Sequence, residues 1–234
     1  MKIGFISDAH GHIGAFVAGL RLLEAQLCDE VFFLGDAIGY IPSPDVVRMV
    51  RKLGIRAVLG NHEAMALLPE PPRNDEVYQL ERCRKLLSDS DMMEISCWPT
   101  HRFLSVKGRD VRLMHGSPTD LTYGYVYPES DLDQLPGVAG SVTVMGNTHR
   151  PFWRSNSRGA LFLNVGSCGL PRDCGGLGSV ATLDVVNQTV HILRFDITKT
   201  ARQALAKCAP VHHSVIALFD RPQTTKLVGE ICVL

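Results

Sequence analysis

The chain has 234 residues, of which 45% are hydrophobic, and its 24 Lys and Arg residues balance 24 Asp and Glu residues. The hydrophobic share argues against global disorder, and the zero net charge argues against a general binder of nucleic-acid backbones. No apolar run approaches the roughly 20 residues that cross a membrane, and Asp8 falls where a secretory signal would still be apolar. We therefore expect a cytoplasmic protein with one sizeable domain or two small ones.

Strands and helices alternate in the first half of the chain. Apolar runs predict strands over residues 2–7, 30–35 and 55–60, and helical spacing predicts a helix over residues 13–27. Ser43-Pro44-Asp45 marks the start of a second helix, with a capping hydroxyl, a proline at the first helical position and an acid. This order predicts a parallel sheet with right-handed crossovers.

The second half is rich in predicted strands. After a break at residues 69–72, we expect a helix over residues 75–87 and strands over residues 102–107, 110–114, 141–145, 160–165, 179–186 and 189–195. Residues 116–128 read as a long surface loop, and Asn187-Gln188 suits a hairpin turn. A helix is expected over residues 198–207, and residues 216–219 suit a short strand or an apolar segment that covers a partner.

The cysteine pattern and the absence of other motifs exclude several classes of catalytic site. There are seven of them and none forms a Cys-x-x-Cys pair, so without an export signal we expect free thiols, with a Cys168–Cys174 disulfide as the alternative. No cysteine has an arginine six positions later, so the loop of a cysteine-dependent phosphatase is absent. A G-x-S-x-G nucleophile elbow and a P-loop are absent from the sequence too.

Polar clusters follow five of the predicted strands: Asp8-Ala9-His10, Gly35-Asp36, Gly60-Asn61-His62-Glu63, His115-Gly116 and Gly146-Asn147-Thr148-His149. Ligands bind beyond the carboxyl ends of strands in open α/β sheets, so we expect these clusters to converge on one face. Each cluster alone has a simpler interpretation, such as a helix N-cap at Asp8 or a packed imidazole at His115. Their joint occurrence favours a functional site.

The side chains in these clusters are carboxylates, imidazoles and amides, without a cysteine. Mixed oxygen and imidazole ligands suit manganese, iron, zinc or, less well, magnesium. The seven or eight candidate ligands exceed what one ion uses, and they suit two ions about 3.5–4 Å apart. The sequence therefore predicts a centre with two metal ions.

These motifs resemble those of the calcineurin-like metallophosphoesterases. The matching patterns are D-x-H at residues 8–10, G-D-x-x-G-Y at 35–40, G-N-H-[DE] at 60–63, H-G at 115–116 and G-x-T-H at 146–149. A later signature, N-x-G-S-x-G-x-P-R-D, matches residues 164–173 and is typical of a small bacterial subgroup that includes relatives of the retromer subunit Vps29. The resemblance covers about residues 1–195, which leaves 196–234 as a C-terminal extension packed on or trailing from the same domain.

The resemblance implies an α/β fold, a layered α/β/β/α sandwich of two mixed sheets flanked by helices. It also implies residue roles. Asp8, His10 and His149 would hold the first metal ion, and Asp36 would bridge both ions. Asn61 and His115 would hold the second, with Asn147 as a further ligand. His62 would protonate the leaving group or stabilise the transition state. We expect two divalent metal ions, with Mn²⁺ as the preferred metal and Fe, Zn or Mg as alternatives.

One position departs from the family pattern. The family usually has G-H-T-H where this chain has Gly146-Asn147-Thr148-His149. The amide oxygen of Asn147 is a weaker ligand than the missing imidazole. We therefore expect the second metal ion to bind less tightly and to exchange readily.

The resemblance further implies hydrolysis of a small phosphate ester. A hydroxide bridging two metal ions would attack phosphorus, and the ions would stabilise charge on the non-bridging oxygens. We expect phosphodiesters or nucleotide polyphosphates as substrates. The alternative is a catalytically weak or inactive protein-binding scaffold on the same fold. Processing of nucleic acids is a third interpretation, and no evident basic surface supports it.

Residues outside the ligand set remain open to two readings. Arg172 would contact the substrate phosphate, or it would form a structural pair with Asp173 or a neighbour. Tyr123, Tyr125 and Tyr127 would stack a nucleobase, or they would pack the loop. The apolar C-terminus at residues 231–234 is compatible with contact between subunits of a homo-oligomer.

Overall fold

The computed structural model describes residues 1–70, 75–187, 189–222 and 231–233. The strands in these residues are β1 (Lys2–Ile6), β2 (Glu30–Phe33), β3 (Arg56–Ala57), β4 (His101–Val106), β5 (Arg109–Met114), β6 (Val142–Met145), β7 (Phe152–Ser155), β8 (Leu161–Asn164), β9 (Leu177–Asp184), β10 (Thr189–Asp196) and β11 (Ile231–Val233). The helices are α1 (Ile13–Ala25), α2 (Asp45–Leu53), α3 (Asn61–Ala66), α4 (Asp75–Tyr78), α5 (Leu80–Leu86), α6 (Asp89–Ser96), the 3₁₀-helix η1 (Leu132–Gln134), α7 (Thr198–Lys207) and α8 (His213–Phe219).

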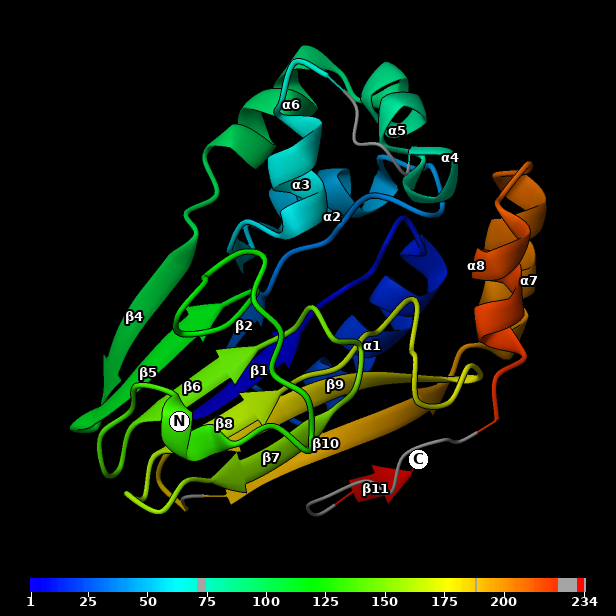
Figure 1. The fold of residues 1–234 in the computed structure, drawn as a ribbon. Coiled ribbons are helices and arrows are strands. Elements are labelled where there is room, and N and C mark those ends of the chain that lie inside the picture. The colour runs from blue at the N-terminus through cyan, green and yellow to red at the C-terminus, as the bar shows by residue number, and fades with distance from the viewer. Residues whose placement is uncertain (71–74, 188, 223–230, 234) are drawn as a thin grey trace.

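Two mixed sheets stack face to face (Figure 1). The first has the strand order β11-β10-β9-β1-β2-β3, and the second has the order β4-β5-β6-β8-β7. As predicted, β1, β2 and β3 are parallel, and β9 and β10 join them as an antiparallel pair. In the second sheet β5, β6 and β8 are parallel, and the edge strands β4 and β7 are antiparallel to their neighbours.

Alternating side chains of β1 build two apolar layers. Phe5 points into the layer between the sheets, where it shares a core cluster with Val144 of β6. The next residue, Ile6, points to the opposite face and shares a cluster with Phe16 of α1, because successive side chains of a strand alternate between faces. The helices α1 and α2 thus cover the outer face of the first sheet (Figure 1).

Residues 116–140, with the short helix η1, cover the outer face of the second sheet. Val126 and Leu132 from this segment are buried with Phe162 of β8 in a third apolar cluster. The expected layered sandwich of two mixed sheets flanked by helical elements is therefore confirmed.

Several predicted elements differ from the structure. The expected helix over residues 75–87 is two helices, α4 and α5, separated by Gln79 with φ of 58°. The third strand spans only Arg56–Ala57, because the chain then turns toward α3. Pro44 is the N-cap of α2 and not its first residue, and the Ser43 hydroxyl accepts from the amide of Asp45. The sequence analysis did not predict the strands β7 and β11, the helices α3 and α6, or the 3₁₀-helix η1.

The described C-terminal residues also differ from the prediction at one element. Residues 216–219 belong to helix α8, so the predicted strand there is wrong. The backbone of β11 pairs with β10 of the same chain. The six described cysteines are free thiols, as predicted. Residues 71–72 of the predicted break and Gln188 of the predicted hairpin turn lie outside the described residues. No helix in the described part of the chain is both long and apolar enough to span a bilayer.

Candidate metal centre

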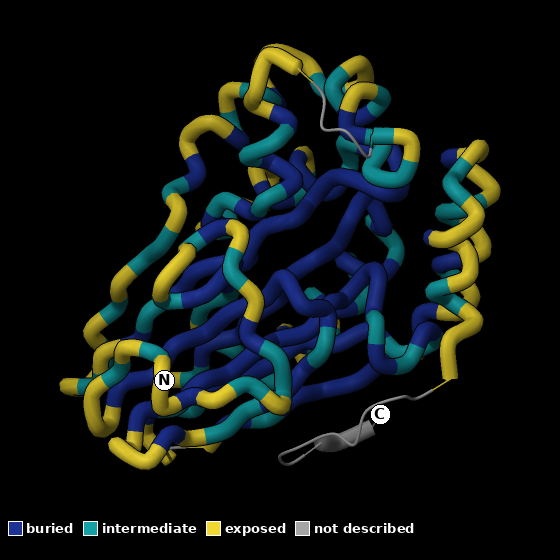
Figure 2. The backbone as a smooth tube through the Cα atoms, viewed as in Figure 1, coloured by how far each residue is buried: buried dark blue, intermediate teal, exposed yellow. Residues whose placement is uncertain are grey.

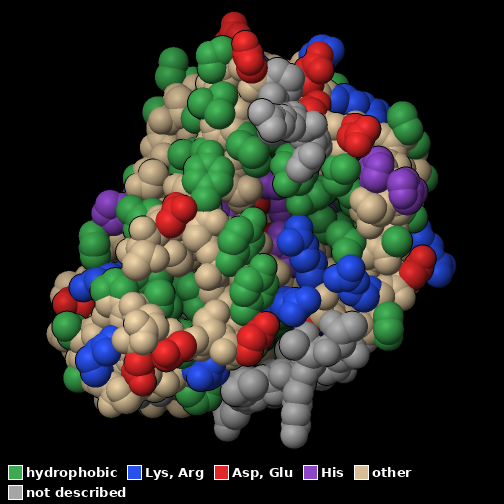
Figure 3. Space-filling view, in the orientation of Figure 1, with side chains coloured by type: hydrophobic (Ala, Val, Ile, Leu, Met, Phe, Trp, Pro, Cys, Tyr) green, Lys and Arg blue, Asp and Glu red, His purple; other side chains and the backbone are tan. Residues whose placement is uncertain are grey.

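The predicted site residues meet at the carboxyl ends of the parallel strands. Residues 8–10 follow β1, Asp36 follows β2, His115 follows β5 and residues 147–149 follow β6, while Asn61 and His62 open α3. Apart from the half-buried Asn61, these ligand candidates are buried (Figure 2). Histidine side chains appear at the bottom of a hollow in the middle of one molecular face, with Lys and Arg side chains beside it (Figure 3).

One group consists of Asp8, His10, Asp36 and His149, whose donor atoms all lie within 4.8 Å of one another. The Nε2 atoms of His10 and His149 are 3.1 Å apart, and Nε2 of His149 is 3.2 Å from Oδ1 of Asp8. Among the described residues, that buried Oδ1 has no hydrogen-bond partner. A buried carboxylate oxygen without a donor fits a cation at this point.

Backbone carbonyls orient the imidazoles of this centre. Nδ1 of His10 donates to Ile38 O at 3.0 Å, and Nδ1 of His149 donates to Leu170 O at 2.5 Å. Burial lowers the pKa of His10, so its ring is neutral and its Nε2 carries a lone pair. The Nε2 atoms of the two rings face each other across 3.1 Å, an arrangement that suits a cation bound by both.

A second group lies on the other side of Asp36. Nε2 of His115 is 3.4 Å from Oδ2 of Asp36 and 3.0 Å from Oδ1 of Asn61, and its Nδ1 donates to Leu34 O at 2.7 Å. Burial opposes a charged ring, but the Asp36 carboxylate raises the pKa of His115 to about 10. A cation bound here would displace that proton. Oδ2 of Asp36 is also 3.5 Å from Nε2 of His10, so this carboxylate lies between both groups.

Asn147 also lies beside the centre, but its hydrogen bonds differ from those of the other ligand candidates. Its backbone amide donates to Oδ2 of Asp8 at 3.2 Å, and its Nδ2 donates to Gly124 O at 2.9 Å. The side-chain amide thus links the centre to the loop after β5. Within the described residues, no hydrogen bond joins its side chain to Asn61 or His115.

Five of these residues have left-handed backbone conformations: φ is 54° at Asp8, 47° at His10, 60° at Asp36, 66° at Asn147 and 57° at His149. Such conformations cost non-glycine residues free energy and concentrate at functional sites. The strands β1, β2 and β6 are therefore each followed by a left-handed turn at their ligand side chains.

Glu63 is a site residue to which the sequence analysis assigned no role, although it is the last residue of the G-N-H-[DE] motif. It is fully buried, and its carboxylate accepts four backbone N–H groups: those of Asp36 at 2.8 Å, Ala37 at 2.7 Å, Ile38 at 3.2 Å and Gly60 at 3.1 Å. Burial and the charge of Asp36 raise the pKa of Glu63 to about 7. Glu63 thereby ties the Asp36 loop to the start of α3.

His62 lies against the Asp36 carboxylate: its backbone N–H donates to Oδ1 of Asp36 at 3.0 Å, whereas its imidazole is not within hydrogen-bond distance of that carboxylate. Its Nε2 is 3.9 Å from Oδ2 of Asp36, and its ring packs against Tyr40 and Tyr78, with centroids 4.8 and 5.0 Å away. Burial lowers the pKa of His62 to about 4, so the imidazole is neutral at pH 7. Its buried Nδ1 has no hydrogen-bond partner among the described residues.

Arg172 has a hydrogen-bond partner at the centre. Its Nη2 donates to the Tyr40 hydroxyl at 2.9 Å. Asp173 is instead bound by the buried Arg194, at 2.5 Å from Nη1 and 3.2 Å from Nη2. Arg172 therefore lies next to Tyr40 at the centre, and the ion pair belongs to its neighbour.

The signature at residues 164–173 joins the ligand loops. Nδ2 of Asn164 donates to Gly146 O at 2.7 Å, and Oγ of Ser167 donates to Asp8 O at 2.7 Å. His12 is buried, with its Nδ1 2.8 Å from Gly169 O. These contacts hold the loops after β1 and β6 in place.

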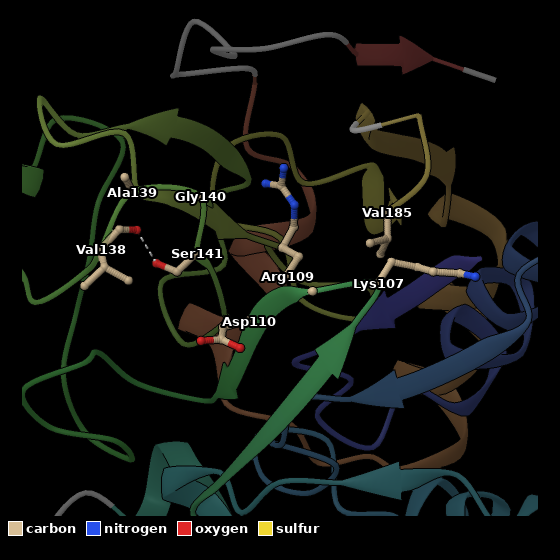
Figure 4. A pocket seen from close by; sticks show the side chains of 9 residues that line it. Lys107, Arg109, Asp110, Val138, Ala139, Gly140, Ser141 and Val185 are labelled. Atoms are coloured by element: carbon tan, nitrogen blue, oxygen red, sulfur yellow. Dashed lines mark hydrogen bonds between the residues drawn. The ribbon is translucent and has the colours of Figure 1, made fainter.

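A separate pocket of about 260 Å³ lies at the amino ends of β5 and β6 (Figure 4). Lys107, Arg109 and Asp110 line one side of it, and Ser141, whose hydroxyl donates to Val138 O at 2.7 Å, lies on the other. The ligand candidates follow the carboxyl ends of the same strands. None of them lines this pocket.

Known proteins are similar to this chain in sequence and in fold. An uncharacterised protein of Methanocaldococcus jannaschii is 25% identical over 229 residues, which are 89% of this chain and 93% of that protein. A metallophosphoesterase from Sphaerobacter thermophilus superposes with a TM-score of 0.76 at 22% identity, covering 94% of this chain and 99% of that one. A hypothetical protein from Pyrococcus horikoshii also gives a TM-score of 0.76, at 13% identity over 93% and 97% of the two chains. The family model of the calcineurin-like phosphoesterase superfamily domain matches residues 1–188, and the chain belongs to that superfamily.

Proposed function

We propose that this protein is a metal-dependent phosphoesterase that hydrolyses phosphodiesters or nucleotide polyphosphates. The observation that carries the proposal is the position of Asp36. Its Oδ2 lies 3.5 Å from Nε2 of His10 and 3.4 Å from Nε2 of His115, between two groups of oriented ligands. A carboxylate in that position can share two cations.

The first ion would be held by Asp8, His10, His149 and Asp36, and the second by Asp36, Asn61 and His115, with the amide oxygen of Asn147 as a weak further ligand. Carboxylate, imidazole and amide donors favour Mn²⁺, with Fe, Zn and Mg as alternatives. When bound, such ions supply a hydroxide at neutral pH and neutralise charge on the phosphate. The free cysteines suit a reducing compartment, so we propose a cytoplasmic location.

The side chains that hold no metal ion would protonate the leaving group and bind the phosphate. His62 is neutral and carries one N–H, which can donate to the leaving oxygen as negative charge develops there. Arg172 offers planar N–H donors that match a phosphate, and the Tyr40 hydroxyl holds its Nη2. These residues would bind and orient the ester beside Asp36.

The test is hydrolysis of bis-p-nitrophenyl phosphate after chelation, with and without added Mn²⁺. We expect turnover to disappear on chelation and to return with Mn²⁺. His62→Ala should keep bound metal and lose far more rate on poor leaving groups than on good ones, and equal losses on both would refute the acid role. Failure of every divalent ion to restore turnover would favour the protein-binding scaffold.

A further inference from the structure

The loop after β5 is held at the edge of the metal centre. It begins directly after His115, and Nδ2 of Asn147 donates to its Gly124 O at 2.9 Å. Within the loop, Gly116 N donates to Leu121 O at 2.8 Å, and Ser117 N donates to Asp120 O at 2.8 Å. These bonds give residues 116–124 a defined path beside the ligands.

The next part of the loop presents two aromatic rings. Val126 is 2% exposed in the apolar cluster over the second sheet, so it anchors the loop. Its neighbours Tyr125 and Tyr127 have nearly parallel rings, 6° apart in plane and 5.9 Å apart between centroids. The guanidinium of Arg150, one residue after His149, lies 5.8 Å from the Tyr127 ring centroid.

Packing within the loop explains the position of the Tyr127 side chain, but it does not explain why Tyr125 is so exposed. Tyr127 is half-buried between Tyr125 and Arg150, whereas 53% of Tyr125 is exposed. Leaving so much of an aromatic ring in water forfeits hydrophobic stabilisation. The residue before Tyr125, Gly124, accepts a hydrogen bond from Nδ2 of Asn147 at 2.9 Å, which places Tyr125 beside the metal centre.

We propose that Tyr125, supported from behind by Tyr127 and Arg150, stacks on a flat aromatic ring carried by the phosphate ester, specifically a nucleobase. This inference rests on the proposed phosphoesterase function and names the substrate class of that site. The phosphate binds beside Asp36 and Arg172, and the ring on its non-leaving arm lies against the open face of Tyr125. A parallel aromatic surface suits bases of any type, because every base has a π-face.

Three chromogenic diesters with the same p-nitrophenolate leaving group isolate this contact: the p-nitrophenyl esters of methyl phosphate, phenyl phosphate and thymidine 5′-phosphate. With the Mn²⁺-loaded protein, we expect kcat/KM to be highest for the thymidine ester. Tyr125→Leu should lower the thymidine-to-methyl ratio of kcat/KM by about 5- to 150-fold, the range that one stacked base supplies. Tyr125→Phe keeps the ring and should keep most of that ratio.

Phe103→Leu is the control, because Phe103 is an even more exposed aromatic residue on β4, with 65% of its surface in solvent. A thymidine-to-methyl ratio near one in the wild type, or an equal fall of that ratio in Phe103→Leu, would overturn the proposal. A preference for the phenyl ester alone would overturn its assignment to a nucleobase. Failure to hydrolyse any of the three esters would instead overturn the proposed function.

Discussion

The orientation of His62 depends on the absence of a side chain at position 39. Gly39 has φ of 92°, and a Cβ there would lie 2.0 Å from Nδ1 of His62. Since Gly39 and Tyr40 belong to the same motif, one turn both makes room for the imidazole and packs the Tyr40 ring against it. The exclusion of a side chain at this turn is thus part of the site.

We predict that Gly39→Ala displaces the His62 ring and lowers turnover by about 100-fold or more, the usual contribution of a positioned acid or base. The metal ligands are separate residues, so metal binding should persist. Gly54→Ala is the control, because Gly54 also has a positive φ, of 62°, but nothing lies within 4 Å of its Cβ position. Steady-state kinetics and metal analysis of both variants check the prediction, and equal losses of activity would contradict it.

A second prediction at the scale of single residues concerns Asn147. Asn147→His should lower the Mn²⁺ concentration that gives half-maximal activity, because imidazole is a stronger ligand than an amide oxygen. Asn147→Ala removes the amide oxygen and should raise that concentration. Titration of Mn²⁺ into the chelated variants measures both, and identical curves for all three proteins would mean that position 147 does not bind metal.

Among the helices, α8 is relevant to function because it borders the candidate metal centre. Val215 of α8 is buried in a cluster with Tyr40 and Leu170. The segment before α8 is fastened by Arg82, which donates to Ala209 O at 3.0 Å and to Pro210 O at 2.7 Å. The part of the chain beyond the family match thus supports Tyr40, which in turn holds Arg172.

We predict that Val215→Asp detaches α8 from Tyr40, because an unpaired carboxylate is costly to bury. Arg172 should then no longer be positioned to bind the phosphate of the substrate. We therefore expect kcat/KM to fall by about 10- to 150-fold, which corresponds to the loss of a charged hydrogen bond worth about 1.5–3 kcal/mol. Ala217→Asp introduces the same charge at an exposed position of the same helix and should have little effect. Retained Mn²⁺ binding in both variants would distinguish this effect from unfolding, and similar kcat/KM values in both would contradict it.

At the scale of the whole molecule, we expect metal binding to be coupled to folding. Asp8, His10, Asp36 and His149 come from positions up to 141 residues apart and meet only in the folded chain. Ions that bind such a centre stabilise the folded state and not the unfolded one. The melting temperature should therefore depend on the concentration of metal.

We predict that Mn²⁺ at about 100 times its Kd raises the melting temperature by about 5–10 °C, which corresponds to about 2.7 kcal/mol in a domain of this size. EDTA should reverse the shift, as differential scanning calorimetry would show. Asp36→Asn removes the carboxylate that faces both ligand groups and should abolish most of the shift. An unchanged shift in that variant would argue that Asp36 holds no metal.

Local patterns explain which elements could be predicted. The strands around β1, β2, β5 and β6 were recognisable because their apolar residues are buried on two faces and polar motifs follow them directly. The single helix predicted over residues 75–87 is wrong, because its apolar spacing does not reveal the left-handed turn at Gln79. In the structure, Oδ1 of Asp75 accepts the amides of Leu80 and Glu81 and so starts a new helix.

The sequence by itself determined the candidate ligand set and the class of fold, because each motif lies next to the apolar strand that carries it. Only the tertiary structure decided the role of Glu63, whose partners come from the Asp36 loop. It also decided that Arg172 bonds to Tyr40 while Arg194 binds Asp173. The physical reason is that these contacts join segments far apart in the chain, and their geometry depends on sheet packing and on left-handed turns that residue types do not encode.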